Sequence, residues 1–181
     1  MGDPLGNHLA YEGELPVIWR ALEALPEWLT LARLNQADEE LLAVIAGQEQ
    51  GRNDLLGDDD DPVAQRLGEL ESKLNLVIDL VGQLLRQNLL IPEPTPLRFN
   101  ADGIIWRPAA PPAEGALVMV ELFPSMLIPR PLSLPGRVNA VEDGEVRVAF
   151  EGIGEPLADM IHKYVFRYHR RAVALARSAR G

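Results

Sequence analysis

The stretch that decides the architecture of this chain is residues 63–88, which read VAQRLGELESKLNLVIDLVGQLLRQN. Its residues recur at alternating spacings of three and four: Val63, Leu67, Leu70, Leu74, Val77, Val81, Leu84 and Asn88. A mean repeat of 3.5 residues is the heptad pattern of helices that wrap around one another. One helix cannot bury such a stripe by itself, so the sequence predicts partner helices.

The heptad positions indicate how many chains assemble. With Leu67 at position a, Leu67 and Leu74 at a alternate with Val63 and Val77 at d, while Leu70 also stands at d. Leucine at a with β-branched residues at d favours three or four strands over two. Further apolar residues at positions e and g widen the stripe: Ile78, Leu80 and Leu85. We expect a parallel coiled coil over residues 62–90, with a tetramer favoured. The alternative is that the stripe packs on helices of residues 14–50 in the same chain.

The segment before this helix, residues 1–61, is predicted to be helical. Apolar residues recur at helical spacing from about residue 14 to residue 50, with a break at Pro26 and a second helix beginning at Asp38. The four aspartates Asp58–Asp61 stand directly before Pro62. Acidic side chains beside a proline at the first helical position are typical of a helix start, so we interpret them as capping residues and not as a cation site.

Composition and charge limit the classes of function. The chain has 181 residues and a net charge of −10, and residues 1–62 alone carry 14 acidic against 3 basic side chains. An acidic protein is a poor binder of polyanions, so no nucleic acid partner is expected. The absence of cysteine excludes disulfides and thiolate metal sites and fits a cytoplasmic protein. Neither a secretory signal nor an apolar run long enough for membrane insertion is visible.

Residues 91–181 change character. Ten of the fifteen prolines lie between Pro92 and Pro135, which is incompatible with long helices. Short strand-like runs alternate with turns, and Asp143-Gly144 between two such runs predicts a hairpin. A final amphipathic helix is expected from Pro156 to about Arg177. This pattern indicates a small antiparallel barrel or sandwich closed by a helix.

Residues 97–171 resemble a PilZ domain. The resemblance rests on the order and spacing of five segments: Leu97–Ile104, Gly115–Leu122, Gly136–Val138, Val146–Phe150 and Leu157–Arg171. It implies a six-stranded antiparallel β-barrel with a C-terminal helix. The helical extension before it looks like that of atypical, oligomeric members of the family from Gram-negative bacteria. We therefore predict an α+β chain in three parts: a helical segment 1–61, an oligomerisation helix 62–90 and a PilZ-like barrel 91–181.

The resemblance also raises the question of cyclic di-GMP. Typical receptors of the family use an R-x-x-x-R segment and a (D/N)-x-S-x-x-G motif. Aligned on Gly103, this chain has Asn100 in place of the serine and Arg98 in place of the acidic residue, and residues 89–96 contain no arginine. Each charge-assisted bond lost is worth about 1.5–3 kcal/mol. We expect no physiological binding of cyclic di-GMP through this degenerate motif.

No other motif proposes chemistry. Ser72, Ser125, Ser133 and Ser178 lack the context of a nucleophile, so no catalytic residue is assigned. His162 and His169 are seven residues apart on the last helix, and neither they nor His8 has the spacing of a zinc site. We expect no metal, no cofactor and no enzyme activity.

These observations predict a non-enzymatic oligomeric adaptor in bacterial signalling that displays several protein-binding surfaces at once. The protein partner is unidentified. Two alternatives remain open. One is a cyclic di-GMP receptor with an unorthodox site at Arg98, Asn100 and Arg107. The other is a nucleic-acid binder that uses the basic C-terminal helix, where six Lys and Arg residues follow His162 without an acid.

Overall fold

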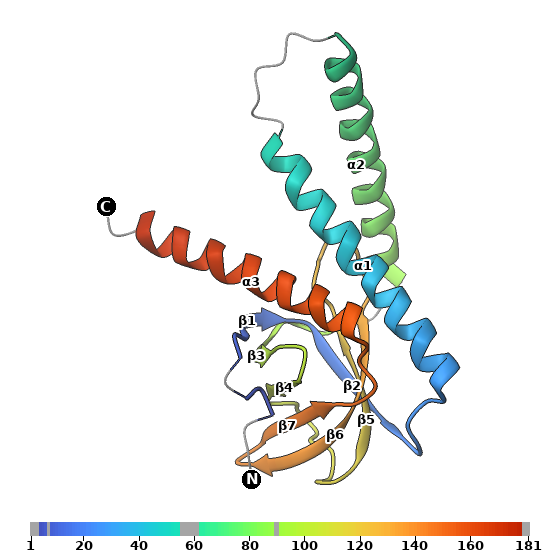
Figure 1. Ribbon diagram of the computed structural model, residues 1–181, viewed down its shortest axis with the longest axis vertical. Helices are drawn as coiled ribbons and strands as arrows, with labels where there is room; N and C mark the ends of the chain where they lie inside the picture. Colours follow the sequence, from blue (N-terminus) through green and yellow to red (C-terminus); the bar gives the residue numbers. More distant parts are fainter. Residues whose placement is uncertain (1–3, 7, 55–61, 89–90, 179–181) are drawn as a thin grey trace.

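The computed structural model describes residues 4–6, 8–54, 62–88 and 91–178, which form one sheet and three long helices (Figure 1). The strands are β1 Tyr11–Leu15, β2 Val17–Leu22, β3 Thr95–Phe99, β4 Gly103–Trp106, β5 Leu117–Leu122, β6 Leu132–Glu142 and β7 Glu145–Phe150. The helices are α1 Trp28–Asp54, α2 Pro62–Asn88 and α3 Glu155–Ser178. None of the described helices combines the length and the hydropathy that a membrane span requires.

The sheet is antiparallel throughout and has the order β1-β3-β4-β7-β6-β5-β2. The prediction of a closed six-stranded barrel is therefore not confirmed, since the sheet has seven strands and its hydrogen-bonded order does not close. The edge strands β1 and β2 are separated only by Pro16, which has no N–H for a ladder. The carbonyl of Pro16 accepts a bond of 3.0 Å from the N–H of Phe123. One run of chain thus passes from one edge of the sheet to the other.

The prediction that residues 1–61 are helical is wrong for β1 and β2, and the helix expected over residues 14–25 does not form. Residues 17–22 pair with β5, with Val17 opposite Leu122 and Leu22 opposite Leu117. The β-branched and aromatic residues of Val17-Ile18-Trp19 suit a strand, and pairing with distant residues overrides the helical spacing. The first helix begins only at Trp28, after Pro26, and continues unbroken to Asp54, without the predicted new start at Asp38.

The hydrophobic core lies between the sheet and the helices α1 and α3. The sheet contributes alternating side chains that include Phe99, Ile104 and Leu134, all fully buried. Helix α3 packs on it through Leu157, Ile161, Tyr164 and Val165, and α1 through Leu41, Leu42 and Ile45. This arrangement confirms the C-terminal helix and its buried stripe.

The hairpin between β6 and β7 forms where the sequence predicts it. Asp143 and Gly144 have φ angles of 50° and 79°. Two successive residues with positive φ are the signature of the tight turn whose twist matches that of the flanking strands.

The connection between α2 and β3 is rich in proline. Pro92, Pro94 and Pro96 alternate with other residues, and residues 91–94 form neither helix nor strand. Each proline fixes its own φ and holds the preceding residue in an extended conformation. The described part of this connection is consequently a stiff, extended spacer, which we call the proline spacer.

A buried carboxylate fixes α1 to the sheet. Asp38 is 2% exposed, and its Oδ2 accepts a hydrogen bond of 2.9 Å from the N–H of Ser133 in β6. Burial raises the pKa of Asp38 to about 6, and the Ser133 bond and the charge of Arg130 oppose this shift only in part. A group whose pKa is higher in the folded state favours folding when it is protonated, so this contribution is lost as the pH rises from about 4 through 6.

We expect Asp38→Asn to stabilise the protein more at pH 7.5 than at pH 4, by on the order of 2 kcal/mol, because asparagine keeps the acceptor and removes the charge. Urea unfolding of both proteins at the two pH values measures this difference. An equal effect of the substitution at both pH values would contradict the assignment.

Candidate functional site: an exposed apolar helix face and a groove of mixed charge

Helix α2 presents its predicted heptad stripe to solvent. Six of its apolar side chains are between 50% and 63% exposed: Leu67, Leu70, Leu74, Val77, Val81 and Leu84. Within the described residues, α2 makes no extensive packing contact with the sheet, α1 or α3. The alternative that the stripe packs on helices of the same chain is therefore not what the structure shows. Val63 and Asn88 lie within α2, but their side chains fall outside the described part.

The apolar surface of α2 is wider than the stripe itself. Leu76 is 59% exposed and Leu80 is 54% exposed, and with Leu67 at position a they fall at positions c and g. Leu76 lies outside the predicted stripe, because position c of a heptad does not belong to the a and d positions that pack in a coiled coil. Exposed apolar surface of this extent on one helix indicates a surface that another protein chain covers.

The residues of the degenerate ligand motif differ in their surroundings, since Asn100 is buried and Arg98 is exposed. Asn100 is fully buried, and its Oδ1 accepts the N–H groups of Asp102 and Gly103 at 2.8 and 3.2 Å. Its Nδ2 donates to the carbonyl of Leu5 at 2.9 Å. The two bonds to Oδ1 hold the turn between β3 and β4, and the bond from Nδ2 ties the N-terminal residues to that turn. Asn100 is thus a buried residue that stabilises this turn.

The N-terminal residues cover this turn. Leu5 is 1% exposed, and a Cβ at Gly103 would lie 3.1 Å from the Cβ of Pro4 and would collide with the carbonyl oxygen of Val148. Gly103 is therefore required by the close approach of β7 and the N-terminal residues. This contact had no signal in the sequence, because residues about 95 positions apart meet only in the folded chain.

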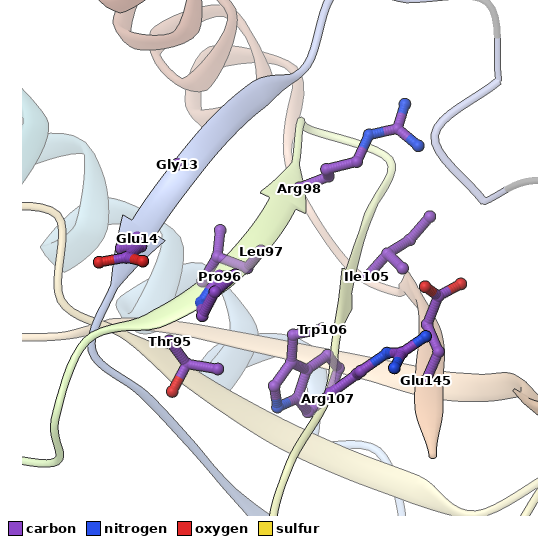
Figure 2. Close-up of a pocket in the computed structure, with 10 residues that line it drawn as sticks. All are labelled: Gly13, Glu14, Thr95, Pro96, Leu97, Arg98, Ile105, Trp106, Arg107 and Glu145. Atoms are coloured by element: carbon purple, nitrogen blue, oxygen red, sulfur yellow. The ribbon is translucent and has the colours of Figure 1, made fainter. Parts of the chain in front are cut away.

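Arg98 and Arg107 line a groove on the outer surface of the sheet, with a volume of about 500 Å³ (Figure 2). Figure 2 shows them on either side of Ile105, with Arg107 extending towards Glu145. Arg98 is already paired, since its Nε lies 3.0 Å from Oε1 of Glu12 in β1. The structure thus brings Arg98 and Arg107 to one groove and places Asn100 elsewhere.

Two of the histidines, His8 and His169, line a neighbouring groove that also includes Arg98. Nδ1 of His8 lies 2.9 Å from Oδ2 of Asp102, and its ring meets that of His162 edge-on at 6.2 Å between centroids. His162 and His169 are exposed on α3. Among the residues that the structure describes, no three His, Asp or Glu side chains are grouped so that they could hold a metal ion.

Comparisons with known proteins agree with the fold and the exposed helix. A family model described as "Atypical PilZ domain, cyclic di-GMP receptor" matches residues 40–178. A solved structure of a pathogenic protein from Xanthomonas campestris is similar to this chain, with 26% sequence identity and a TM-score of 0.75 over 93% of this chain and 92% of that one. It is described as a tetrameric PilZ domain self-assembled via an unusual helical bundle. No curated protein matches.

The matched region begins in α1, includes all of α2 and ends at the last residue of α3. It is therefore longer than the 97–171 segment that carried the resemblance in the sequence, and it includes the helix with the heptad stripe. Since the match spans well over half of its residues, this chain belongs to the atypical PilZ domain family.

Proposed function

We propose that this protein is a non-enzymatic adaptor that assembles through α2 and displays several PilZ-like sheets for protein–protein interaction. The observation that carries the proposal is the exposed apolar face of α2, with six heptad side chains each at least half exposed. We expect a parallel bundle, and Leu67 and Leu74 at a with Val63 and Val77 at d favour three or four strands over two. The tetrameric, helically bundled Xanthomonas protein supports four chains.

The division into residues 1–61, 62–90 and 91–181 and a cytoplasmic location stay predictions. An adaptor of this design gains from avidity, because four weakly binding surfaces on one oligomer engage a multivalent partner far more tightly than one. Light scattering of the full chain tests the assembly. We expect a mass of about 80 kDa, four times the 20.0 kDa of one chain. A mass of one chain at micromolar concentration would overturn the proposal.

We further propose that the protein does not bind cyclic di-GMP at physiological concentration. Residues 89–96, where the arginine pair of typical receptors would precede the first strand, contain no arginine, and the amide oxygen of Asn100 is engaged by the turn. Isothermal titration of the full chain with cyclic di-GMP is expected to show no saturable heat at 100-micromolar ligand, since loss of two or three charge-assisted bonds weakens binding by about a thousandfold or more. Saturable binding with low-micromolar affinity would contradict this prediction.

A cyclic di-GMP receptor with an unorthodox site is the second candidate, because the matching family model is described as a receptor of this ligand and the groove holds two arginines. Charge reversal distinguishes it from the adaptor. Under this alternative, the affinity for cyclic di-GMP depends on Arg98 and Arg107, and Asn100 does not contact the ligand. The double variant Arg98→Glu/Arg107→Glu would then abolish binding, whereas Arg33→Glu on α1 would leave it unchanged.

A further inference from the structure

Helix α3 carries a second exposed surface that the coiled coil does not use. Lys163, Phe166, Arg170 and Val173 recur at spacings of three and four and are all exposed, so they form one stripe along the outer side of the helix, which we call the outer stripe. Phe166 is 54% exposed, and the guanidinium carbon of Arg170 lies 6.0 Å from the centre of its ring. The outer stripe therefore combines apolar and positively charged groups.

The outer stripe is accessible for most of its length. In Figure 1 the C-terminal half of α3 extends away from the sheet, and residues 169–174 are all exposed. The ion pairs of the described residues involve neither Lys163 nor Arg170. Two unneutralised cations beside an exposed aromatic ring are a surface that an acidic segment with apolar side chains would complement.

The chain itself contains a segment of this composition. Residues 54–61 read DLLGDDDD, with five aspartates, two leucines and no basic residue. We propose that the outer stripe of α3 is a docking surface for this acidic connector of a second copy of the chain. Aspartates would pair with Lys163 and Arg170, and the leucines would cover Phe166 and Val173.

A second copy fits better than the same copy. The connector joins the end of α1 to the start of α2, and Figure 1 shows α1 and α3 diverging towards their C-terminal ends. Seven residues held at both ends reach only about 12 Å from those ends. Extended polyanions fit less well than a short acidic segment, because the net charge of −10 repels DNA and anionic membranes over their whole length.

A labelled peptide of residues 52–62, RNDLLGDDDDP, tests the proposal directly. The receptor is the full chain with Asp58–Asp61 changed to asparagine, so that its own connectors do not compete and the capping role is kept. We expect a Kd of roughly 0.1–1 mM in 50 mM salt by fluorescence anisotropy, weakened about tenfold in 500 mM salt. Arg170→Glu in this receptor is expected to weaken binding at least about fivefold. Arg33→Glu, a matched charge reversal on the exposed side of α1, should leave it unchanged.

The proposal is overturned if the peptide does not bind at a receptor concentration of 5 mM. It is also overturned if the receptor with Arg170→Glu and the receptor with Arg33→Glu bind the peptide with equal affinity. Binding of a DNA duplex or of phosphatidylglycerol vesicles that depends on Arg170, without binding of the peptide, also overturns it and assigns the stripe to polyanions. The docking proposal does not depend on the coiled coil. If the full chain were monomeric, the adaptor proposal would be wrong, but the affinity of the receptor for the peptide would still test the docking.

Discussion

Replacing Leu74 with aspartate is expected to convert the oligomer into single chains. Leu74 is the second of the four a positions of the heptad stripe and is 60% exposed in one chain, so in a bundle its neighbours would come from other copies. A four-stranded coil would place four aspartates in one buried layer. Each chain loses about 2 kcal/mol of leucine burial and gains a desolvated charge that repels its three counterparts.

Sedimentation velocity measures the outcome. Leu74→Asp should sediment near the 20.0 kDa of one chain at concentrations where the parent is an oligomer. Ser72→Asp is the matched control, because Ser72 is exposed two residues away at position f, on the opposite side of the helix. If Ser72→Asp dissociates the protein as completely as Leu74→Asp does, the heptad stripe is not the interface between the chains.

The second large effect is expected in the core. Phe99 is fully buried in β3, and its ring lies 5.3 Å from the ring of Tyr11 and 6.2 Å from that of Tyr164, centre to centre. Phe99→Ala removes contacts that join β1, β3 and α3 at one point. We expect a loss of about 3–5 kcal/mol in the free energy of unfolding, which is a large fraction of the stability of a typical domain.

Phe166→Ala is the control for this prediction, since the same atoms are removed from an exposed position on α3. Its effect on stability should stay below about 1 kcal/mol. Denaturant unfolding followed by tryptophan fluorescence compares the two variants, and the three tryptophans remain unchanged in both. Equal losses for Phe99→Ala and Phe166→Ala would contradict the placement of Phe99 in the core.

The features that the sequence predicted correctly depend on neighbours in the chain. The helix α2 and its apolar stripe follow from a repeat that any window of a dozen residues reveals. The turn at Asp143-Gly144 follows from two residues that tolerate positive φ. The expectation that Arg98 and Asn100 do not form a regular ligand site also came from local comparison with a motif, and it stays a prediction.

The features that were not predicted from the sequence depend on residues far apart in the chain. The apolar residues of the segment 15–22 fit a helix by spacing, and only the pairing of Val17–Leu22 with β5 makes them a strand. Asp38 resembles an ordinary acidic residue at a helix start, and its burial arises from contact with β6, 95 residues later. Interactions of this range leave no periodic signal, so they could not be inferred from one sequence.

The proline spacer has a mechanical consequence for the assembled protein. A flexible linker would let each sheet rotate independently of the helix that holds it, whereas the restricted backbone torsions of Pro92 and Pro94 would limit that rotation over residues 91–94. A small change in the winding of the helices would then turn every attached sheet by a related angle. Strain applied to one sheet by a bound partner would travel back through the same joint, so the sheets would respond together and not one at a time.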